Sequence, residues 1–218
     1  MKNRINFYTD FNLDLIRKLL LVKHKIQSLS QNFVPERIQI KKLANKRNET
    51  CIIWYSLESF KNTYLQSEQI NQDNISKNLD QKIDEFANEL IDISNFYEKT
   101  IMFSFISNKQ FKKNPLTSYA QNGDSLIASK LNLVLAQKIN NIPEMYFFDT
   151  QTLMSKTNKP FDIKNWYLTK NPFNLNFIKE VVNEITNILK ILSEEKKIKL
   201  ILLDLDNTIW GGEAGENG

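Results

Sequence analysis

Short runs of apolar and aromatic residues alternate along this sequence with longer segments of helical periodicity, and this alternation constrains the fold most. Four segments have the composition of β-strands: residues 4–8, 51–55, 100–106 and 145–149. Four others repeat apolar side chains at helical spacing: residues 12–28, 80–97, 124–140 and a stretch that Asn174 begins as a cap and that continues to residue 195. Strands that alternate with helices form parallel βαβ units. The sequence therefore predicts a three-layer α/β/α domain with a mainly parallel, flavodoxin-like sheet.

Other segments carry weaker signals. Residues 37–40 predict a short strand, and the polar residues 66–78 predict a loop or a surface helix. We expect irregular structure at 108–122 and 156–172, which contain prolines. Asp124 or Ser125 is the expected cap of the helix that begins there.

Charge and cysteine content exclude several classes of protein. The 29 basic and 25 acidic residues are interspersed, so no clustered basic face for nucleic acid is predicted. No apolar stretch approaches the roughly 20 residues that cross a bilayer, and no signal peptide is visible. The lone cysteine, Cys51, is expected to be a buried strand residue. We therefore expect a cytoplasmic protein with no nucleic acid and no membrane among its partners.

The last twenty residues carry the pattern that is most informative about chemistry. Residues 198–203 form a nearly continuous apolar run, which is typical of a parallel strand buried on both faces. Asp204 and Asp206 follow it, then Thr208, and four of the five glycines lie between 211 and 218. Open α/β sheets place their ligands beyond the carboxyl ends of their strands. The repulsion between two close carboxylates is relieved by a hard cation such as Mg²⁺.

These carboxylates predict phosphoryl transfer. Asp204 would attack phosphorus as a nucleophile and form an aspartyl-phosphate. Asp206 would protonate the leaving group and later activate water. Mg²⁺ bound by the two carboxylates would offset charge in the transition state. The alternative for the same residues is an acidic turn without chemistry.

The segment Leu-Asp-Leu-Asp-Asn-Thr-Ile-Trp-Gly-Gly at 203–212 resembles motif one of the haloacid dehalogenase (HAD) superfamily. Its last six residues, with Gly-Glu-Asn-Gly at 215–218, are similar to the FkbH-like branch, the subfamily IIIC phosphatases. Members of that branch carry an N-terminal domain related to SGNH hydrolases, and residues 165–174 resemble the join between the domains. The resemblance implies an SGNH-hydrolase-like domain at 1–196 and the beginning of a Rossmannoid HAD-like phosphatase domain at 197–218.

The resemblance also implies a substrate, a metal and a partner. It implies a Mg²⁺-dependent phosphatase acting on a phosphorylated small molecule, with Asp204 and Asp206 as catalytic residues and metal ligands. Thr208 corresponds to the threonine that supports the phosphate-binding loop. Members of the branch load a glyceryl-type unit onto an acyl carrier protein or act in polyketide or surface-polysaccharide pathways. The three later HAD motifs would lie beyond Gly218, so we expect a truncated chain with little or no activity alone.

The SGNH-like part lacks a recognisable hydrolase triad. Thr9 and Asp10 follow the first strand, where such enzymes place a nucleophile, usually serine, and the only histidine, His24, lies in the first predicted helix. Asn171 precedes Pro172, where related hydrolases tend to carry His-Pro. We therefore expect a non-catalytic domain that positions a substrate or a carrier protein. A scaffold module with no phosphatase function and an active esterase are the two other readings.

Overall fold

The computed structural model describes residues 4–23, 26, 28–32, 46–65, 72–107, 115–120 and 123–193. Within them, one five-stranded sheet has the order β2-β1-β3-β4-β5, and every pair of neighbouring strands is parallel. The strands are β1 (Arg4–Thr9), β2 (Ser28–Asn32), β3 (Lys46–Trp54), β4 (Tyr97–Phe103) and β5 (Met145–Phe148). The chain builds outward from β1 to β2 and then returns to place β3 on the other side of β1. The carboxyl ends of β1 and β3 therefore form the switch point at which such sheets hold ligands.

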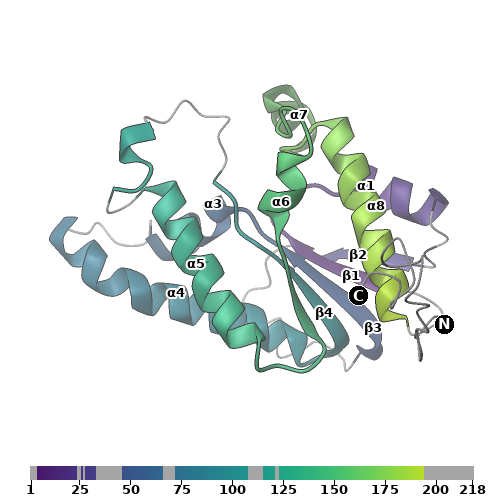
Figure 1. Ribbon diagram of the computed structural model, residues 1–218, viewed down its shortest axis with the longest axis horizontal. Coiled ribbons are helices and arrows are strands. Elements are labelled where there is room, and N and C mark those ends of the chain that lie inside the picture. Colours follow the sequence, from purple (N-terminus) through teal and green to yellow (C-terminus); the bar gives the residue numbers. More distant parts are fainter. Residues whose placement is uncertain are drawn as a thin grey trace, which may run out of the picture.

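Helices cover both faces of the sheet, which confirms the predicted three-layer α/β/α arrangement (Figure 1). On one face lie α4 (Gln72–Ser94) and α5 (Asp124–Ile139), and on the other lie α1 (Asp14–Lys23) and α8 (Leu175–Leu192). Three shorter helices follow strand ends or the loops after them: α3 (Leu57–Phe60), α6 (Thr150–Ser155) and α7 (Ile163–Thr169). A π-helical turn, Lys61–Leu65, continues α3, and a 3-10 turn spans Pro115–Thr117. No helix in these ranges is both long enough and apolar enough to span a membrane.

Alternate side chains of the central strand β3 pack into two separate hydrophobic cores, one on each face of the sheet. Cys51 and Ile53 point to the α4–α5 side, and Ile52 and Trp54 point to the α1–α8 side, as the two-residue period of a strand requires. Cys51 is fully buried, as predicted. A strand that is buried on both faces reads as a continuous apolar run, which is why this strand was evident in the sequence.

Several predicted boundaries are wrong. Ser28 begins β2 and does not end a helix, because this polar strand lies at the sheet edge and lacks the apolar pattern of an inner strand. Tyr97 begins β4, whereas the sequence placed it at the end of the preceding helix. Residues 72–78 belong to α4, in agreement with the surface-helix alternative. The span 156–172 is not wholly irregular, since it contains α7. Gly123, with extended backbone angles, occupies the cap position before α5 in place of Asp124 or Ser125.

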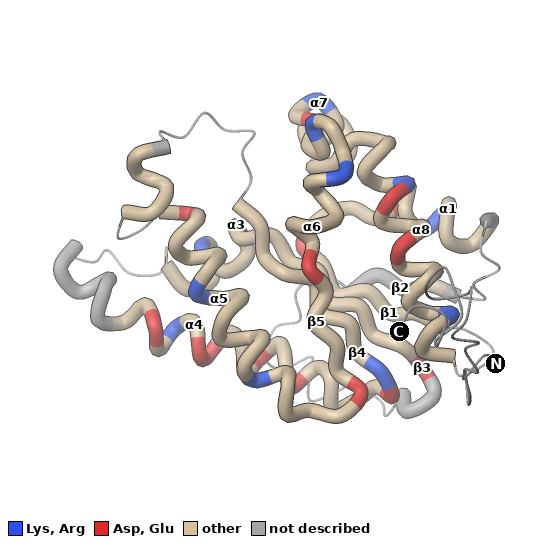
Figure 2. The backbone as a smooth tube through the Cα atoms, in the orientation of Figure 1, with Lys and Arg blue, Asp and Glu red and all other residues tan. Residues whose placement is uncertain are grey.

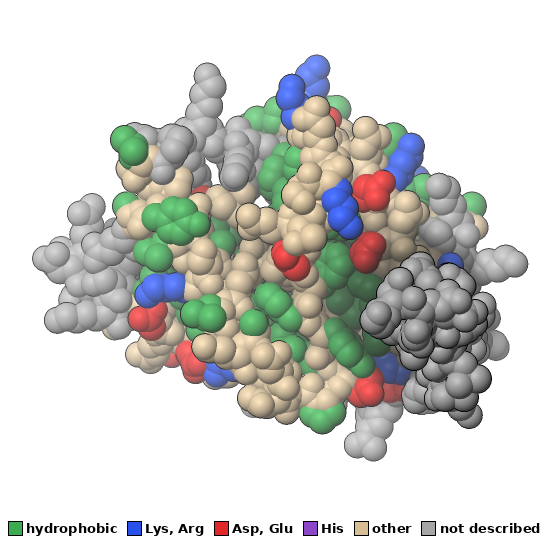
Figure 3. Space-filling model, viewed as in Figure 1, with side chains coloured by type: hydrophobic (Ala, Val, Ile, Leu, Met, Phe, Trp, Pro, Cys, Tyr) green, Lys and Arg blue, Asp and Glu red, His purple; other side chains and the backbone are tan. Residues whose placement is uncertain are grey.

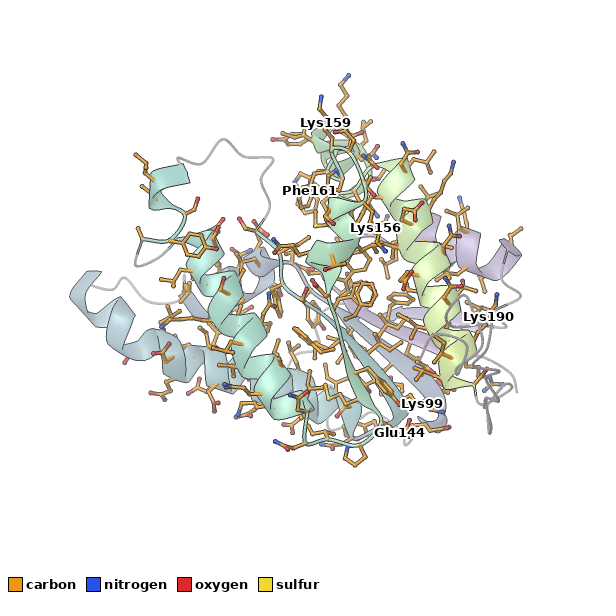
Figure 4. The ribbon with its side chains drawn as sticks, in the orientation of Figure 1. Lys99, Glu144, Lys156, Lys159, Phe161 and Lys190 are labelled. Carbon is orange, nitrogen blue, oxygen red and sulfur yellow. The ribbon has the colours of Figure 1, made fainter. Side chains whose placement is uncertain are left out.

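Helix α8 runs along the strands, so that its two ends lie at opposite ends of the strands. Asn174 caps its first turn, accepting a hydrogen bond from the Phe177 N–H at 2.8 Å, as predicted. At the other end, the Lys99 ammonium donates to the Leu192 carbonyl at 3.0 Å, which ties α8 to the amino-terminal part of β4 (Figure 4). The last described residues, at the end of α8, therefore lie near the amino-terminal ends of the strands, away from the switch point. The predictions for residues 37–40, 66–71 and 108–114 lie outside the described residues.

Candidate functional site

A carboxylate and a hydroxyl meet at the switch point. Asp10 follows β1 and Ser56 follows β3, which pairs with β1 along the sheet. One oxygen of the Asp10 carboxylate accepts the Ser56 N–H at 2.8 Å, and the other accepts the Ser56 hydroxyl. Both residues are half-buried. This pair therefore joins the two loops between which a ligand of an open α/β sheet would lie.

The Asp10 charge is held in a poorly solvated environment. Burial raises the pKa of the Asp10 carboxyl, the hydrogen bonds from Ser56 act in the opposite direction, and Glu58 adds a smaller upward contribution. Burial outweighs hydrogen bonding here, although both carboxylate oxygens are bonded. Acids displaced from their ordinary pKa gather at functional sites more often than elsewhere, which makes Asp10 a candidate site residue.

Tyr55 adds an unused polar group beside this pair. Its side chain is buried, and its hydroxyl has no hydrogen-bond partner in the described part of the chain. Burial raises the pKa of the Tyr55 phenol well above its ordinary value, with smaller contributions from Cys51 and Asp10. The phenol is therefore neutral at ordinary pH. Buried polar groups without partners are uncommon in folded proteins, so the Tyr55 hydroxyl is available to a water or a ligand.

Polar groups at the ends of β4 and β5 are occupied by the fold itself. The Ser104 hydroxyl accepts the Thr150 N–H at 2.9 Å, and the Thr150 hydroxyl donates to the Ser104 carbonyl at 3.0 Å. Asn132 accepts the Phe105 N–H and donates to its carbonyl. These bonds hold the loops at the carboxyl ends of β4 and β5.

Asn171 stands near the loop after β1, but it also has a structural role. Its side chain is only 5% exposed, and its amide donates to the Asn12 carbonyl at 2.8 Å and accepts the Phe173 N–H at 2.9 Å. The Asn12 N–H in turn donates to the Lys170 carbonyl at 3.0 Å. An amide cannot accept a proton at neutral pH. The Thr9 hydroxyl is likewise buried and bonded to the backbone of Phe11.

The three site residues proposed from the sequence lie outside the described residues. Asp204, Asp206 and Thr208 therefore stay predictions, as does the strand at 198–203. Among the residues that are described, no group of three or more His, Cys, Asp or Glu side chains could hold a metal ion. The sequence reasoning noted Asp10 but missed Ser56. The available signal was a polar residue directly after each of two adjacent strands.

Comparison with known proteins identifies solved structures that share this fold. No protein-family model and no curated protein matches the sequence. A solved structure that does match is the N-terminal part of a Bacteroides fragilis protein containing a phosphatase domain, complexed with Mg: the TM-score is 0.65 at 16% identity, over 99% of this chain. An acetyl-xylooligosaccharide esterase from Geobacillus and a GDSL-like lipase from Parabacteroides merdae each match at a TM-score of 0.50 and 10% identity. Each covers 86% of this chain, and this chain covers 95% and 96% of them, respectively.

These likenesses define the class of the described domain. It is an α/β domain with the fold of the SGNH hydrolases, as the sequence predicted. At identities of 16% and below they establish the fold and not the activity. The chain spans 58% of the length of the Bacteroides fragilis structure.

Proposed function

We propose that this chain is the N-terminal part of an FkbH-like phosphatase or phosphotransferase of the HAD superfamily. The observation that carries the proposal is the apolar run at 198–203 followed by Asp204, Asp206 and Thr208, in a chain whose preceding part has an SGNH-hydrolase-like fold. The likeness over 99% of the chain to a structure that contains a phosphatase domain and Mg supports the same combination of domains. The proposed division places the SGNH-like domain at 1–196 and the start of the phosphatase domain at 197–218.

In this proposal the two carboxylates share the chemistry. An Asp204 oxygen attacks phosphorus and forms an aspartyl-phosphate, while the leaving oxygen takes a proton from Asp206. Asp206 then removes a proton from water, which attacks the same phosphorus and releases phosphate and free Asp204. Two carboxylates at this spacing supply the hard oxygen ligands that Mg²⁺ prefers, and the bound ion would offset phosphoryl charge. Thr208 supports the loop that holds the phosphoryl group.

The substrate and the partner come from the same resemblance. We propose a phosphorylated small molecule as the substrate and an acyl carrier protein as the acceptor of a glyceryl-type unit, in polyketide or surface-polysaccharide biosynthesis. The chemistry itself requires only a phosphate monoester and an ordered phosphoryl-binding loop.

We propose that the SGNH-like domain is not catalytic and binds or positions a ligand. Asn171 occupies the place of a base, and both ends of its amide are bonded to backbone groups. The Thr9 hydroxyl is buried and bonded to its own loop. The one histidine in the sequence, His24, comes directly after the last residue of α1 and lies outside the described residues.

The reading frame beyond residue 218 tests the proposal without any assay. A serine or threonine, then a lysine, then a pair of aspartates, in this order, supports the phosphatase. A stop codon at position 219 overturns it and leaves the binding domain as the function of the chain.

A further inference from the structure

The short helix α7 presents an outer face that the fold does not use. Ile163 and Tyr167 are four residues apart and so share a face, and Lys164 and Leu168 form the adjacent row. Tyr167 is 68% exposed and Leu168 is 82% exposed. We call Lys159, Ile163, Lys164, Tyr167 and Leu168 the α7 surface.

The inner side of α7 accounts for its attachment to the domain. Trp166 packs against the α1–α8 core, and the Asn165 amide donates to the Phe173 carbonyl at 2.9 Å. Phe161 and Phe173, which flank α7 in sequence, form an antiparallel bridge, and their stacked rings have centroids 5.5 Å apart. The α7 surface is therefore fixed in place by other residues, and none of its own side chains is needed for that.

The α7 surface is basic as well as apolar. Residues 156–170 include one acidic residue, Asp162, and four exposed lysines: Lys156, Lys159, Lys164 and Lys170. Asp162 is occupied as the cap of α7, since it accepts the Lys164 and Asn165 N–H groups. Within the described ranges none of the four lysines is in an ion pair, and the Lys170 ammonium lies over the Trp166 ring.

The figures show how this charge is distributed. Basic positions gather around α7 at the top of the molecule, whereas acidic positions predominate along α4 (Figure 2). Lysine side chains project from the same end in the space-filling view (Figure 3), and Lys156, Lys159 and Phe161 lie together there (Figure 4). Rows of apolar and basic side chains on one face are complementary to rows of apolar and acidic side chains on a partner.

We infer that the α7 surface docks an acidic, amphipathic helix of a partner protein. Charge complementarity selects an acidic partner over the same face of a second copy of this chain, because two copies of this lysine-bearing face would repel each other. The segment directly after α7 also contacts the loop after β1. The backbone carbonyl of Lys170, directly after α7, accepts the Asn12 N–H, and the Asn171 side-chain amide donates to the Asn12 carbonyl in the loop after Asp10. The carboxyl end of α7 is therefore attached to the loop that carries Asp10.

The inference does not rest on the proposed phosphoryl transfer, because its test measures binding alone. The probe is a fluorescein-labelled helical peptide with leucines along one face bordered by glutamates, titrated with the chain and followed by anisotropy. The charge variant is Lys159→Glu with Lys164→Glu, and its matched control is Arg17→Glu with Lys18→Glu on α1. The apolar variant is Leu168→Gln, and its control is Leu133→Gln, which changes a leucine on α5 that is 59% exposed.

We expect the α7 variants each to weaken peptide binding by about tenfold, while both controls bind like the unchanged chain. Binding should also weaken with added salt. Circular dichroism establishes that every variant is folded. The inference is overturned if the peptide does not bind, if the control pair on α1 weakens binding as much, or if the chain binds anionic phospholipid vesicles through these lysines and not the peptide.

Discussion

The Asp10 carboxylate accepts two hydrogen bonds from Ser56, one from its N–H and one from its hydroxyl, although the two residues are 46 positions apart in sequence. The pair lies between β1 and β3, where the strand order of the sheet changes direction. A desolvated carboxylate at this place reduces stability, since burial raises its pKa despite both bonds. Proteins keep such costs most often where function requires them.

The first prediction concerns the pH dependence of Asp10. A carboxyl with a raised folded-state pKa binds its proton more tightly in the folded protein, so stability falls as the pH rises from the unfolded pKa through the folded pKa. Asp10→Asn keeps an acceptor for the Ser56 N–H and offers a donor to the Ser56 hydroxyl. Urea unfolding should therefore show Asp10→Asn to be at least as stable as the natural chain at pH 7, with an advantage that shrinks in acid.

Asp10→Ala is the control for this experiment. It leaves the Ser56 N–H and hydroxyl without their acceptor, and we expect a loss of about 1–3 kcal/mol. If Asp10→Asn is as destabilising as Asp10→Ala at pH 7, the charge itself stabilises the fold and our account of the carboxylate is wrong.

The second prediction concerns Asn171 as a structural tie. Asn171→Ala removes the donor to the Asn12 carbonyl and the acceptor of the Phe173 N–H, both at largely buried positions. The free energy of unfolding should fall by about 1–3 kcal/mol. Asn158→Ala, at an exposed position, should change it by less than about 0.5 kcal/mol. Equal, small effects of the two substitutions would contradict the assigned role.

The third prediction concerns the aromatic core beneath α7 and α8. Trp54 is buried and stacks on Phe103 and Phe173, with ring centroids at 4.7 Å and 5.0 Å. Trp54→Ala should lower the free energy of unfolding by about 3–5 kcal/mol, because it opens a cavity between the sheet and these rings. Trp166→Ala should have a smaller effect, since that ring is only half-buried. The reverse ranking would contradict the assignment of the core.

The fourth prediction distinguishes a non-catalytic binding domain from an active esterase. Because Asn171 cannot act as a base and the Thr9 hydroxyl is buried, hydrolysis of p-nitrophenyl acetate by the chain should not exceed that by its Ser56→Ala variant. Hydrolysis above background that Ser56→Ala abolishes would make Ser56 a nucleophile and would restore the esterase reading.

The sequence predicted the layers of the fold because its inner strands are buried on both faces. Residues 51–55 and 100–106 read clearly as strands for that reason, and the apolar stripe of α8 and its Asn174 cap were equally legible. β2 was missed because an edge strand does not need apolar side chains on both faces. α7 was missed because a seven-residue helix is too short to show periodicity and is stabilised by tertiary contacts of Trp166 and Asn165.

The candidate site was harder to predict than the fold. Asp10 could be noted as a polar residue after a strand, but its pairing with Ser56 depends on which strands are neighbours. Sheet order is a tertiary property that no local pattern contains. Asp204, Asp206 and Thr208 were identified by local pattern alone, and a measurement on the protein must test them.

The most direct measurement is phosphate release by the longer protein to which we propose that this chain belongs. With Mg²⁺ and a phosphorylated small molecule that carries a glyceryl-type unit, Asp204→Asn should abolish phosphate release while its circular dichroism spectrum matches that of the unchanged protein. Ser56→Ala should retain phosphate release. Turnover retained in Asp204→Asn would contradict the assignment of the nucleophile and with it the proposed function.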